Sequence, residues 1–209
     1  MKYGYMYVLD SMADWEYGLA VAELNTGRFF KRQGERLPMK TFALDRMAVT
    51  TMGGLKITPD VAIGDITPPD AALLLLPGGN MWQETKHQEV LKMAMDFLQA
   101  GVLVAAICGA TEAMAQSGML DNRPHTSNSL DYLKMVFPSY KGEANFKQAP
   151  VVVDKNLITA ASTAPVDFAY HIIDKLDVFS QRTLKAWYQY FQAHDPKQLF
   201  ELMDSLPKD

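Results

Sequence analysis

A lone cysteine, Cys108, stands where an apolar segment ends and a segment of small residues begins. The residues before it read VLVAAI and those after it read GATEAMAQS. A buried strand that runs directly into a helix is typical of a nucleophile elbow, which needs small neighbours and exposes its side chain at the strand end. The amides and dipole at the helix start favour a thiolate, so we expect a thiol pKa well below about 8.5. The alternative is an inert core cysteine.

A Pro77-Gly78-Gly79 turn ends an earlier apolar segment, Ala71 to Leu76. If the two apolar segments are neighbouring parallel strands, this turn lies beside Cys108. The backbone N–H groups of Gly79 and Gly109 could then form an oxyanion hole, because glycine lets a substrate oxygen approach the main chain closely. The alternative is a turn without a chemical role.

A carboxyl group, Glu16, follows the opening apolar segment and is flanked by Trp15 and Tyr17. If Glu16 faces Cys108, desolvation and a nearby thiolate both raise its pKa, and the neutral acid can donate a hydrogen bond to the sulfur. The alternative is an exposed glutamate that merely suits the helix dipole.

The elements that must position these groups alternate between apolar runs and helical periodicity. The patterns predict strands over Tyr3–Leu9, Lys40–Asp45, Ala71–Leu76 and Val102–Ile107, and helices over Asp14–Gly27, Lys86–Ala100, Gly109–Ser117, Leu130–Val136 and Val166–Leu176. Such alternation is typical of a layered α/β sandwich with right-handed crossovers. The fully apolar run Ala71–Leu76 belongs at the centre of the sheet, covered on both faces by helices.

Two hairpins complete the expected fold, one over Val49–Ile63 around Gly53-Gly54 and one over Pro150–Ala161. The first predicts a sheet that is mixed at one edge. From Ser180 onward the chain predicts one or two further helices, and no linker or repeat divides it. We therefore expect one domain over residues 1–209, with a helical extension from about residue 178.

Composition excludes several partners. The 209 residues carry a formal net charge of -4 and no cluster of Lys and Arg, which argues against nucleic acid. Asp10 interrupts the first apolar run and no later run approaches the roughly 20 apolar residues of a membrane span, so we expect a cytoplasmic location. The single cysteine makes no intramolecular disulfide. The four histidines (87, 125, 171 and 194) are scattered, and we expect no metal and no cofactor.

Four of these segments, AAICGAT, LLLLPGG, ADWE and ITAASTAPVDFA, together resemble the ThiJ/PfpI superfamily over roughly Met1 to Leu176. The resemblance implies a flavodoxin-like three-layer α/β sandwich, similar to class I glutamine amidotransferase domains, with a mostly parallel central sheet, helices on both faces and an edge hairpin. It also implies Cys108 as nucleophile, Glu16 as the carboxyl bonded to its sulfur, and Gly79 with Gly109 as oxyanion donors.

Histidine is where the chain departs from many relatives, which place it directly after the cysteine or at the end of a Thr-Thr-His segment. Here that segment reads His125-Thr126-Ser127-Asn128, so Asn128 aligns with the familiar histidine and His125 stands three positions earlier. His125 could serve as the base if its loop turns inward. The alternative is a loop histidine bonded to backbone.

The resemblance also assigns pocket residues. It places Thr163, Ala164 and Pro165 at the pocket mouth, and Gly78, Trp82 and Asn128 in contact with a substrate, whereas helix packing is the alternative for Trp82. The Gly-x-Cys-x-Gly elbow and late His-x-Glu pair of true glutamine amidotransferases are missing.

Two functions follow as hypotheses. The first is a cysteine-dependent hydrolase or lyase, of amidase, peptidase or glyoxalase type, that acts on a small carbonyl or amide compound. The second is a non-enzymatic redox sensor or stress-protective protein whose Cys108 is oxidised. Relatives usually form homodimers, which the resemblance implies here as well.

Overall fold

The centre of the protein is a seven-stranded sheet with the strand order β5-β2-β1-β6-β7-β9-β8. A computed structural model describes residues 2–193 and 195–207, so His194 lies outside the described residues. The strands are β1 (Tyr3–Tyr7), β2 (Met39–Ala43), β5 (Val61–Ala62), β6 (Ala71–Leu76), β7 (Leu103–Ile107), β8 (Val151–Asp154) and β9 (Leu157–Ala160). The mostly parallel α/β fold expected from the sequence is confirmed.

The parallel strands β1 and β6 are neighbours at the middle of the sheet. The strand that follows β1 in the sequence is added on one side of this pair and the strand that follows β6 on the other, so the strand order reverses between them. Every neighbouring pair from β5 to β9 is parallel, and β8 is antiparallel to β9. In open α/β sheets, ligands bind beyond the carboxyl ends of the strands at such a reversal. The residues that follow β1, β6 and β7 therefore meet where a site is expected.

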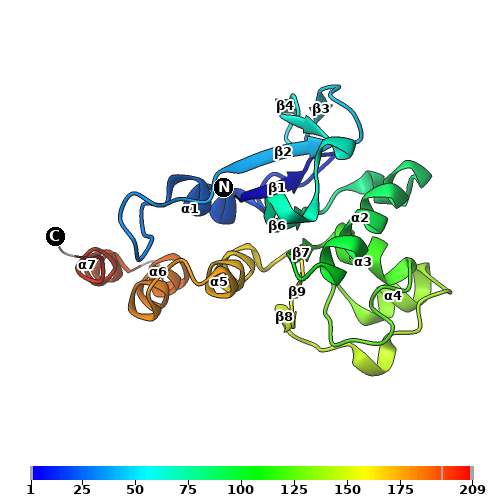
Figure 1. Cartoon of the computed structure of the whole chain (residues 1–209). Coiled ribbons are helices and arrows are strands. Elements are labelled where there is room, and N and C mark those ends of the chain that lie inside the picture. Colours follow the sequence, from blue (N-terminus) through cyan, green and yellow to red (C-terminus); the bar gives the residue numbers. More distant parts are fainter. Residues whose placement is uncertain (1, 194, 208–209) are drawn as a thin grey trace.

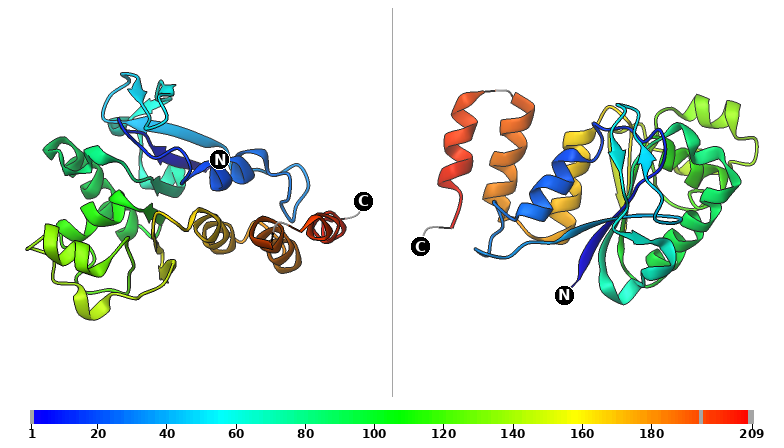
Figure 2. Two further views of the ribbon diagram at one scale, coloured as in Figure 1. Left: turned by 180° about the vertical axis from the view of Figure 1, so that it is seen from behind. Right: turned by 90° about the horizontal axis from the view of Figure 1, so that it is seen from above.

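Helices cover both faces of the sheet (Figure 1). On one side lie α1 (Gly18–Thr26), α5 (Pro165–Leu176), α6 (Gln181–Ala193) and α7 (Pro196–Asp204), and on the other α2 (Gln88–Gln99), α3 (Gly109–Gln116) and α4 (Leu130–Val136). The right-hand view of Figure 2 shows α6 and α7 stacked outward beyond α1 and α5. Short 3-10 turns join the elements: η1 (Ile63–Asp65), η2 (Pro68–Asp70), η3 (Asn80–Gln83), η4 (Thr85–His87) and η5 (Glu143–Asn145).

The hairpin around Gly53-Gly54 differs from the sequence-based expectation. Its strands β3 (Val49–Thr50) and β4 (Lys56–Ile57) form a separate two-stranded sheet, and β5 then joins the central sheet parallel to β2. The hairpin therefore does not make the central sheet mixed. The mixed edge is the second predicted hairpin, β8 with β9. A turn sequence such as Gly53-Gly54 predicts that two strands pair with each other, but it does not predict which sheet they join.

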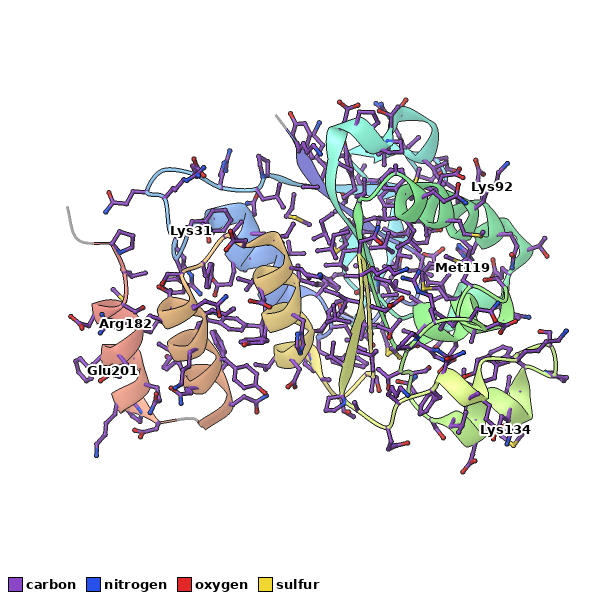
Figure 3. The ribbon with its side chains drawn as sticks, turned by 60° about the horizontal axis from the view of Figure 1, so that its bottom comes forward. Lys31, Lys92, Met119, Lys134, Arg182 and Glu201 are labelled. Atoms are coloured by element: carbon purple, nitrogen blue, oxygen red, sulfur yellow. The ribbon has the colours of Figure 1, made fainter. Side chains whose placement is uncertain are left out.

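The core fills the space between the sheet and the two helix layers, and β6 and β7 are its most enclosed strands. Leu73 to Leu76 and Val104 to Ile107 are all fully buried, as expected for parallel strands covered on both faces. Figure 3 shows side chains packed on both sides of the strands, with Lys92 and Lys134 outside one layer and Arg182 and Glu201 outside the other.

No helix among residues 2–193 and 195–207 combines the length and apolar character that crossing a membrane requires.

Candidate active site

Cys108 lies at the end of β7 and caps the start of α3 with a backbone conformation of φ 57° and ψ -126°. A side chain rarely adopts a positive φ of this kind, so the conformation is strained and must be held by its surroundings. Its N–H donates to the carbonyl oxygen of Ala160 at 3.0 Å, and its own carbonyl oxygen accepts from the Thr111 hydroxyl at 2.6 Å. These bonds fix the elbow between β9 and α3.

Gly78 makes room for the elbow. A Cβ atom at this position would lie 2.7 Å from the Cys108 Cβ, 2.8 Å from Glu16 Oε2 and 2.9 Å from the Cys108 sulfur. These separations are below van der Waals contact, so no larger residue fits while the turn, the thiol and the carboxyl stay in place. The N–H of Gly78 donates to Glu16 Oε2 at 2.6 Å. Gly78 thus joins three segments at one point.

Glu16 is buried next to the Cys108 sulfur, with 1% of its surface exposed. Burial raises the pKa of its carboxyl to about 7, although the Gly78 N–H and the Cys108 thiol act in the opposite direction. The other carboxyl oxygen, Oε1, is buried and lacks a hydrogen-bond partner among the described residues. A buried, unpaired carboxyl oxygen is costly when charged, and a proton on it would lower that cost.

The pKa of the Cys108 thiol differs from the low value expected from the sequence. Burial raises the pKa of Cys108 to about 11, the charge of Glu16 adds to this, and donors from Asn128 and Gly109 only partly oppose it. The amides at the helix start favour the thiolate, but desolvation of the sulfur and the nearby Glu16 carboxylate raise the thiol pKa by more. This balance depends on tertiary contacts that the local sequence pattern does not contain.

The two groups titrate as a pair, because each changes the pKa of the other: the charge of Glu16 raises the pKa of Cys108, and the hydrogen bond with Cys108 lowers the pKa of Glu16. Between about pH 7 and about pH 11 the pair Glu16 and Cys108 holds one proton. That proton belongs to the pair and not to one residue. When it lies on Glu16, the sulfur is a thiolate and the repulsion between the two charges is gone.

Asn128 occupies the position next to the sulfur where many relatives place histidine. Its Nδ2 group donates to the Cys108 sulfur at 3.4 Å and to Glu112 Oε1 at 2.7 Å, and its Oδ1 accepts from the Ser162 N–H at 2.9 Å. All donors of this amide are engaged, so its orientation is fixed. The side chain can stabilise negative charge on sulfur, but it cannot transfer a proton.

Glu112 is a second carboxyl group near the sulfur, and it lines the cavity above it. Burial raises the pKa of this carboxyl, and the bond from Asn128 partly opposes the shift. A signal was present in the sequence: Glu112 lies in the first turn of α3, directly after the elbow at Cys108.

The two glycines expected to form an oxyanion hole do lie together at the cavity wall. A Cβ atom at Gly109 would lie 2.9 Å from the carbonyl oxygen and 3.2 Å from the nitrogen of Gly79. Gly79 is held by an antiparallel bridge to Met12, and its neighbour Asn80 donates its N–H to the Ser11 hydroxyl at 2.9 Å. Both backbones are therefore rigidly placed beside Cys108.

His125 is not brought to the sulfur. It is fully buried and does not line the cavity. Its Nδ1 lies 2.8 Å from the carbonyl oxygen of Arg123 and its Nε2 lies 2.6 Å from the Tyr140 hydroxyl. A carbonyl only accepts, so Nδ1 carries the proton and Nε2 accepts from Tyr140. Burial lowers the pKa of His125. The expected inward turn of this loop does not occur, because His125 completes its hydrogen bonds elsewhere.

The expected mouth residues also differ. Thr163, Ala164 and Pro165 are not among the lining residues of the cavity, because Ala164 caps α5 and Pro165 begins it. The preceding residue, Ser162, reaches the site through its bond to Asn128. Trp82 does reach the cavity wall, but it is 1% exposed and its indole N–H donates to the Pro77 carbonyl oxygen.

Above the sulfur lies a cavity of about 560 Å³. Cys108, Glu112 and Asn128 form what we call its polar floor, and its rim carries exposed apolar side chains from three separate segments, namely Trp15, Met52, and Tyr132 with Val136 on α4. The lining residues are Ala13, Trp15, Met52, Gly79, Asn80, Trp82, Gln83, Cys108, Gly109, Glu112, Asn128, Ser129, Tyr132, Val136 and Phe137. Among the described residues, no group of three or more His, Cys, Asp or Glu side chains could hold a metal ion.

Comparison with known proteins gives consistent relatives. The model of the DJ-1/PfpI family matches residues 4–175. A Bacillus subtilis (strain 168) protein named "Uncharacterized protease YoaZ" is 46% identical over 97% of this chain and 96% of its own length. "Protein/nucleic acid deglycase 2" of Escherichia coli (strain K12) is 25% identical over 75% of this chain and 84% of its own length.

Solved structures agree with these sequence matches. A thiJ/pfpI family protein from Bacillus anthracis superposes with a TM-score of 0.95 at 46% identity, covering 99% of this chain and 98% of its own. The DJ-1 superfamily protein Atu0886 from Agrobacterium tumefaciens gives 0.80 at 33% identity, covering 93% and 99%.

Proposed function

The chain belongs to the DJ-1/PfpI family, and from this premise we propose that it is a cysteine-dependent hydrolase or lyase for small carbonyl or amide compounds, with Cys108 as nucleophile. One observation carries the proposal. The sulfur of Cys108 lies at a strained elbow, between a sealed carboxyl that can hold its proton and a fixed amide donor, and it opens into a cavity.

The chemistry begins when the shared proton lies on Glu16 and the Cys108 sulfur is negative. The sulfur adds to the carbonyl carbon of the substrate, and the carbonyl π electrons move to the oxygen. The N–H groups of Gly79 and Gly109 stabilise this oxyanion, as preorganised backbone donors do in acyl transfer. With an amide, the amine leaves with a proton and a thioester remains. Water hydrolyses the thioester and returns the thiol.

The cavity favours a substrate larger than a two- or three-carbon dicarbonyl. Its volume of about 560 Å³ lies within the range of sites for drug-sized ligands. Trp15, Met52 and Tyr132 on the rim are each more than a third exposed. We expect an apolar substituent of the substrate to cover them, while its carbonyl group reaches the polar floor.

The names of the relatives fit both branches of the proposal. YoaZ and YdeA of Bacillus subtilis (strain 168) are named proteases, which are amide hydrolases, and the Escherichia coli relative is named a deglycase. Both amide hydrolysis and carbonyl chemistry begin with addition of a nucleophile to a carbonyl carbon.

A direct test measures lactate formation from methylglyoxal and amine release from a panel of model amides, with the wild type and Cys108→Ser. We expect turnover of at least one compound class in the wild type, reduced by at least about 100-fold in Cys108→Ser. Equal turnover in both proteins would remove Cys108 from the chemistry, and no turnover of either class by the wild type would overturn the hydrolase or lyase assignment.

A redox sensor is the second candidate, and the donors around the sulfur favour it. Asn128 donates to the sulfur, and a protonated Glu16 could donate to an oxygen added there. The oxidant would be a peroxide, which adds one oxygen per molecule reduced to water. Mass spectrometry after mild peroxide treatment separates the candidates. Stable sulfinate at Cys108 without turnover supports the sensor, whereas turnover that depends on Cys108 supports the enzyme.

A further inference from the structure

The proposed chemistry needs a group that moves a proton on the substrate, and neither His125 nor Asn128 supplies it. His125 is turned away and bonded to Arg123 and Tyr140. The amide of Asn128 has no proton to transfer near neutral pH. A titratable group on the open side of the sulfur is therefore required.

Two carboxyl groups flank the sulfur in different surroundings. Glu16 is 1% exposed, bonded to the Gly78 N–H and absent from the cavity lining. Glu112 is half-buried and lines the cavity. Glu16 can exchange a proton with Cys108 but not with a substrate in the cavity, whereas Glu112 faces the space that a substrate would occupy. Two carboxyls with divergent environments commonly take two roles in one reaction.

Asn128 fixes the position of the Glu112 carboxyl relative to the Cys108 sulfur. Its amide donates one hydrogen to Glu112 Oε1 at 2.7 Å and the other to Cys108 at 3.4 Å. The Ser162 N–H donates to Asn128 Oδ1, so the amide cannot flip without losing this bond. The carboxyl and the sulfur thus have a fixed relation through one rigid group.

The other residues that line the cavity offer no better proton-transfer group than Glu112. Among the described lining residues the titratable side chains are Cys108, Glu112 and Tyr132, and none is Lys, Arg or His. The charge on Glu112 also raises the pKa of Glu16. Burial raises the pKa of Glu112 itself, which brings it closer to the pH at which a carboxyl acts well as both base and acid.

We propose that Glu112 is the catalytic acid and base that transfers protons on the substrate, in place of the histidine found in many relatives. This inference rests on the proposed function of Cys108 and assigns a further residue to the same site. Glu16 then serves the sulfur, and Glu112 serves the substrate.

With methylglyoxal as the probe, the steps balance without an outside oxidant. The Cys108 sulfur adds to the aldehyde carbon, and the protonated Glu112 carboxyl gives its proton to the new alkoxide. The resulting Glu112 carboxylate removes the proton from that carbon and returns it to the neighbouring carbonyl carbon, while the hydroxyl proton on the first carbon passes to the oxygen on the second. The first carbon is thereby oxidised to a thioester and the second is reduced. Water then hydrolyses the thioester: its OH group joins the acyl carbon, the sulfur leaves as a thiolate, and its remaining proton restores the Glu112 carboxyl. The lactic acid ionises to lactate, and the pair Glu16 and Cys108 keeps its one proton throughout.

The test uses Glu112→Gln, because glutamine keeps the oxygen that accepts from Asn128 but cannot transfer a proton. We expect kcat for lactate formation to fall by about 100-fold or more, with the rate of Cys108 alkylation by iodoacetamide unchanged within about twofold. A covalent methylglyoxal adduct on Cys108 should accumulate and be seen by mass spectrometry. Glu89→Gln, on the exposed face of α2 and outside the cavity, is the matched control.

Two outcomes overturn the inference. One is a Glu112→Gln kcat close to that of the wild type, and the other is a parallel loss of kcat and alkylation rate, which would make Glu112 a positioning residue. Cys108→Ser separates this failure from that of the proposed function. If Cys108→Ser keeps wild-type turnover, or if the wild type turns over neither methylglyoxal nor the model amides, both ideas are wrong. If the wild type turns over only amides, the same comparison of kcat for Glu112→Gln is made on amine release. If Cys108→Ser alone is inactive, only the role of Glu112 is wrong.

Discussion

The proton shared by Glu16 and Cys108 governs how reactive the sulfur is. Burial raises the pKa of Glu16 to about 7 and the pKa of Cys108 to about 11. Below about pH 7 both groups are protonated, and between the two values one proton remains. The sulfur is a nucleophile only in the fraction of molecules in which that proton lies on Glu16.

Alkylation of Cys108 by iodoacetamide should therefore accelerate as the pH rises through about 7, because the pair loses its first proton there. In Glu16→Gln the carboxyl that shares a proton with Cys108 is gone, so this step should disappear. The remaining titration should lie below about 11, since the charge of Glu16 no longer raises the pKa of the thiol. Rates measured from pH 5 to pH 11 in both proteins test this, and superimposable profiles would contradict the coupling.

His125 should prove structural in character. His125→Phe leaves the Tyr140 hydroxyl and the Arg123 carbonyl without their partner, and Tyr140→Phe removes only one of these bonds. An unpaired buried polar group costs about 1–3 kcal/mol. We expect the free energy of unfolding in urea to fall by that amount for His125→Phe and by less for Tyr140→Phe, with unchanged alkylation of Cys108. A large loss of alkylation with little loss of stability would restore His125 as a functional candidate.

At the scale of elements, the turn after β6 packs tightly against the elbow after β7. The strands are parallel neighbours, with Leu76 opposite Ala106, so their carboxyl ends deliver Gly78 and Cys108 to the same place. The segment after β1 adds Glu16 from the adjacent strand. Three chain segments thus share one small volume, and glycine at position 78 is what allows it.

Gly78→Ala should disrupt this junction. The added methyl group would lie 2.7 Å from the Cys108 Cβ and 2.8 Å from Glu16 Oε2, and such overpacking costs typically about 1–3 kcal/mol. We expect reduced stability and a Cys108 alkylation profile that no longer rises through pH 7. Gly64→Ala is the matched control, because nothing lies within 4 Å of a Cβ there. Equal effects of the two substitutions would show that Gly78 is not tightly packed.

The rim of the cavity draws on separate elements, with Trp15 before α1 and Tyr132 on α4. If these side chains cover an apolar substituent, phenylglyoxal should be a better substrate than methylglyoxal by about tenfold in kcat/KM, since burying part of a ring contributes about 1–2 kcal/mol. Trp15→Ala should reduce this preference, whereas Met95→Ala, an exposed apolar residue outside the cavity, should not. Equal kcat/KM values for both aldehydes would argue against an apolar subsite.

At the scale of the whole molecule, α3 and α4, which contribute lining residues to the cavity, and the last two helices lie on opposite sides of the sheet (Figures 1 and 2). The family model matches residues 4–175, which end within α5 and before α6. Helix α6 nevertheless joins the core, because Trp187 is fully buried and its indole N–H donates to Glu23 Oε1 at 3.0 Å. The extension is packed against the rest of the fold.

Trp187→Ala should therefore lower the free energy of unfolding by about 3–5 kcal/mol, the usual range for a buried tryptophan, while leaving alkylation of Cys108 in the folded protein unchanged. Phe200→Ala on α7, where the ring is 74% exposed, should change stability by no more than about 0.5 kcal/mol. Urea denaturation should show one transition if residues 1–209 form one domain. Separate transitions, or a small effect of Trp187→Ala, would mean that the extension is only loosely attached.

Most helices and strands, their alternation and the elbow at Cys108 could be predicted from local sequence. The predicted helix over Leu130–Val136 and the strands around Ala71–Leu76 and Val102–Ile107 agree with the structure, because periodicity, turns and small neighbours are local properties of the chain. The placement of Cys108 between such elements also follows from local sequence. The resemblance of ADWE, LLLLPGG and AAICGAT to one superfamily was sufficient to identify the family.

The groups that meet at the sulfur, and their effect on its charge, follow from contacts between distant parts of the chain. His125 bonds to Tyr140, Asn128 takes the place beside Cys108, and Glu112 rises into the cavity. The sign of the thiol pKa shift also depended on tertiary contacts, since desolvation and the charge of Glu16 outweigh the donors at the helix start. Burial and charge pairing are sums over residues distant in the sequence, and no local pattern contains those sums.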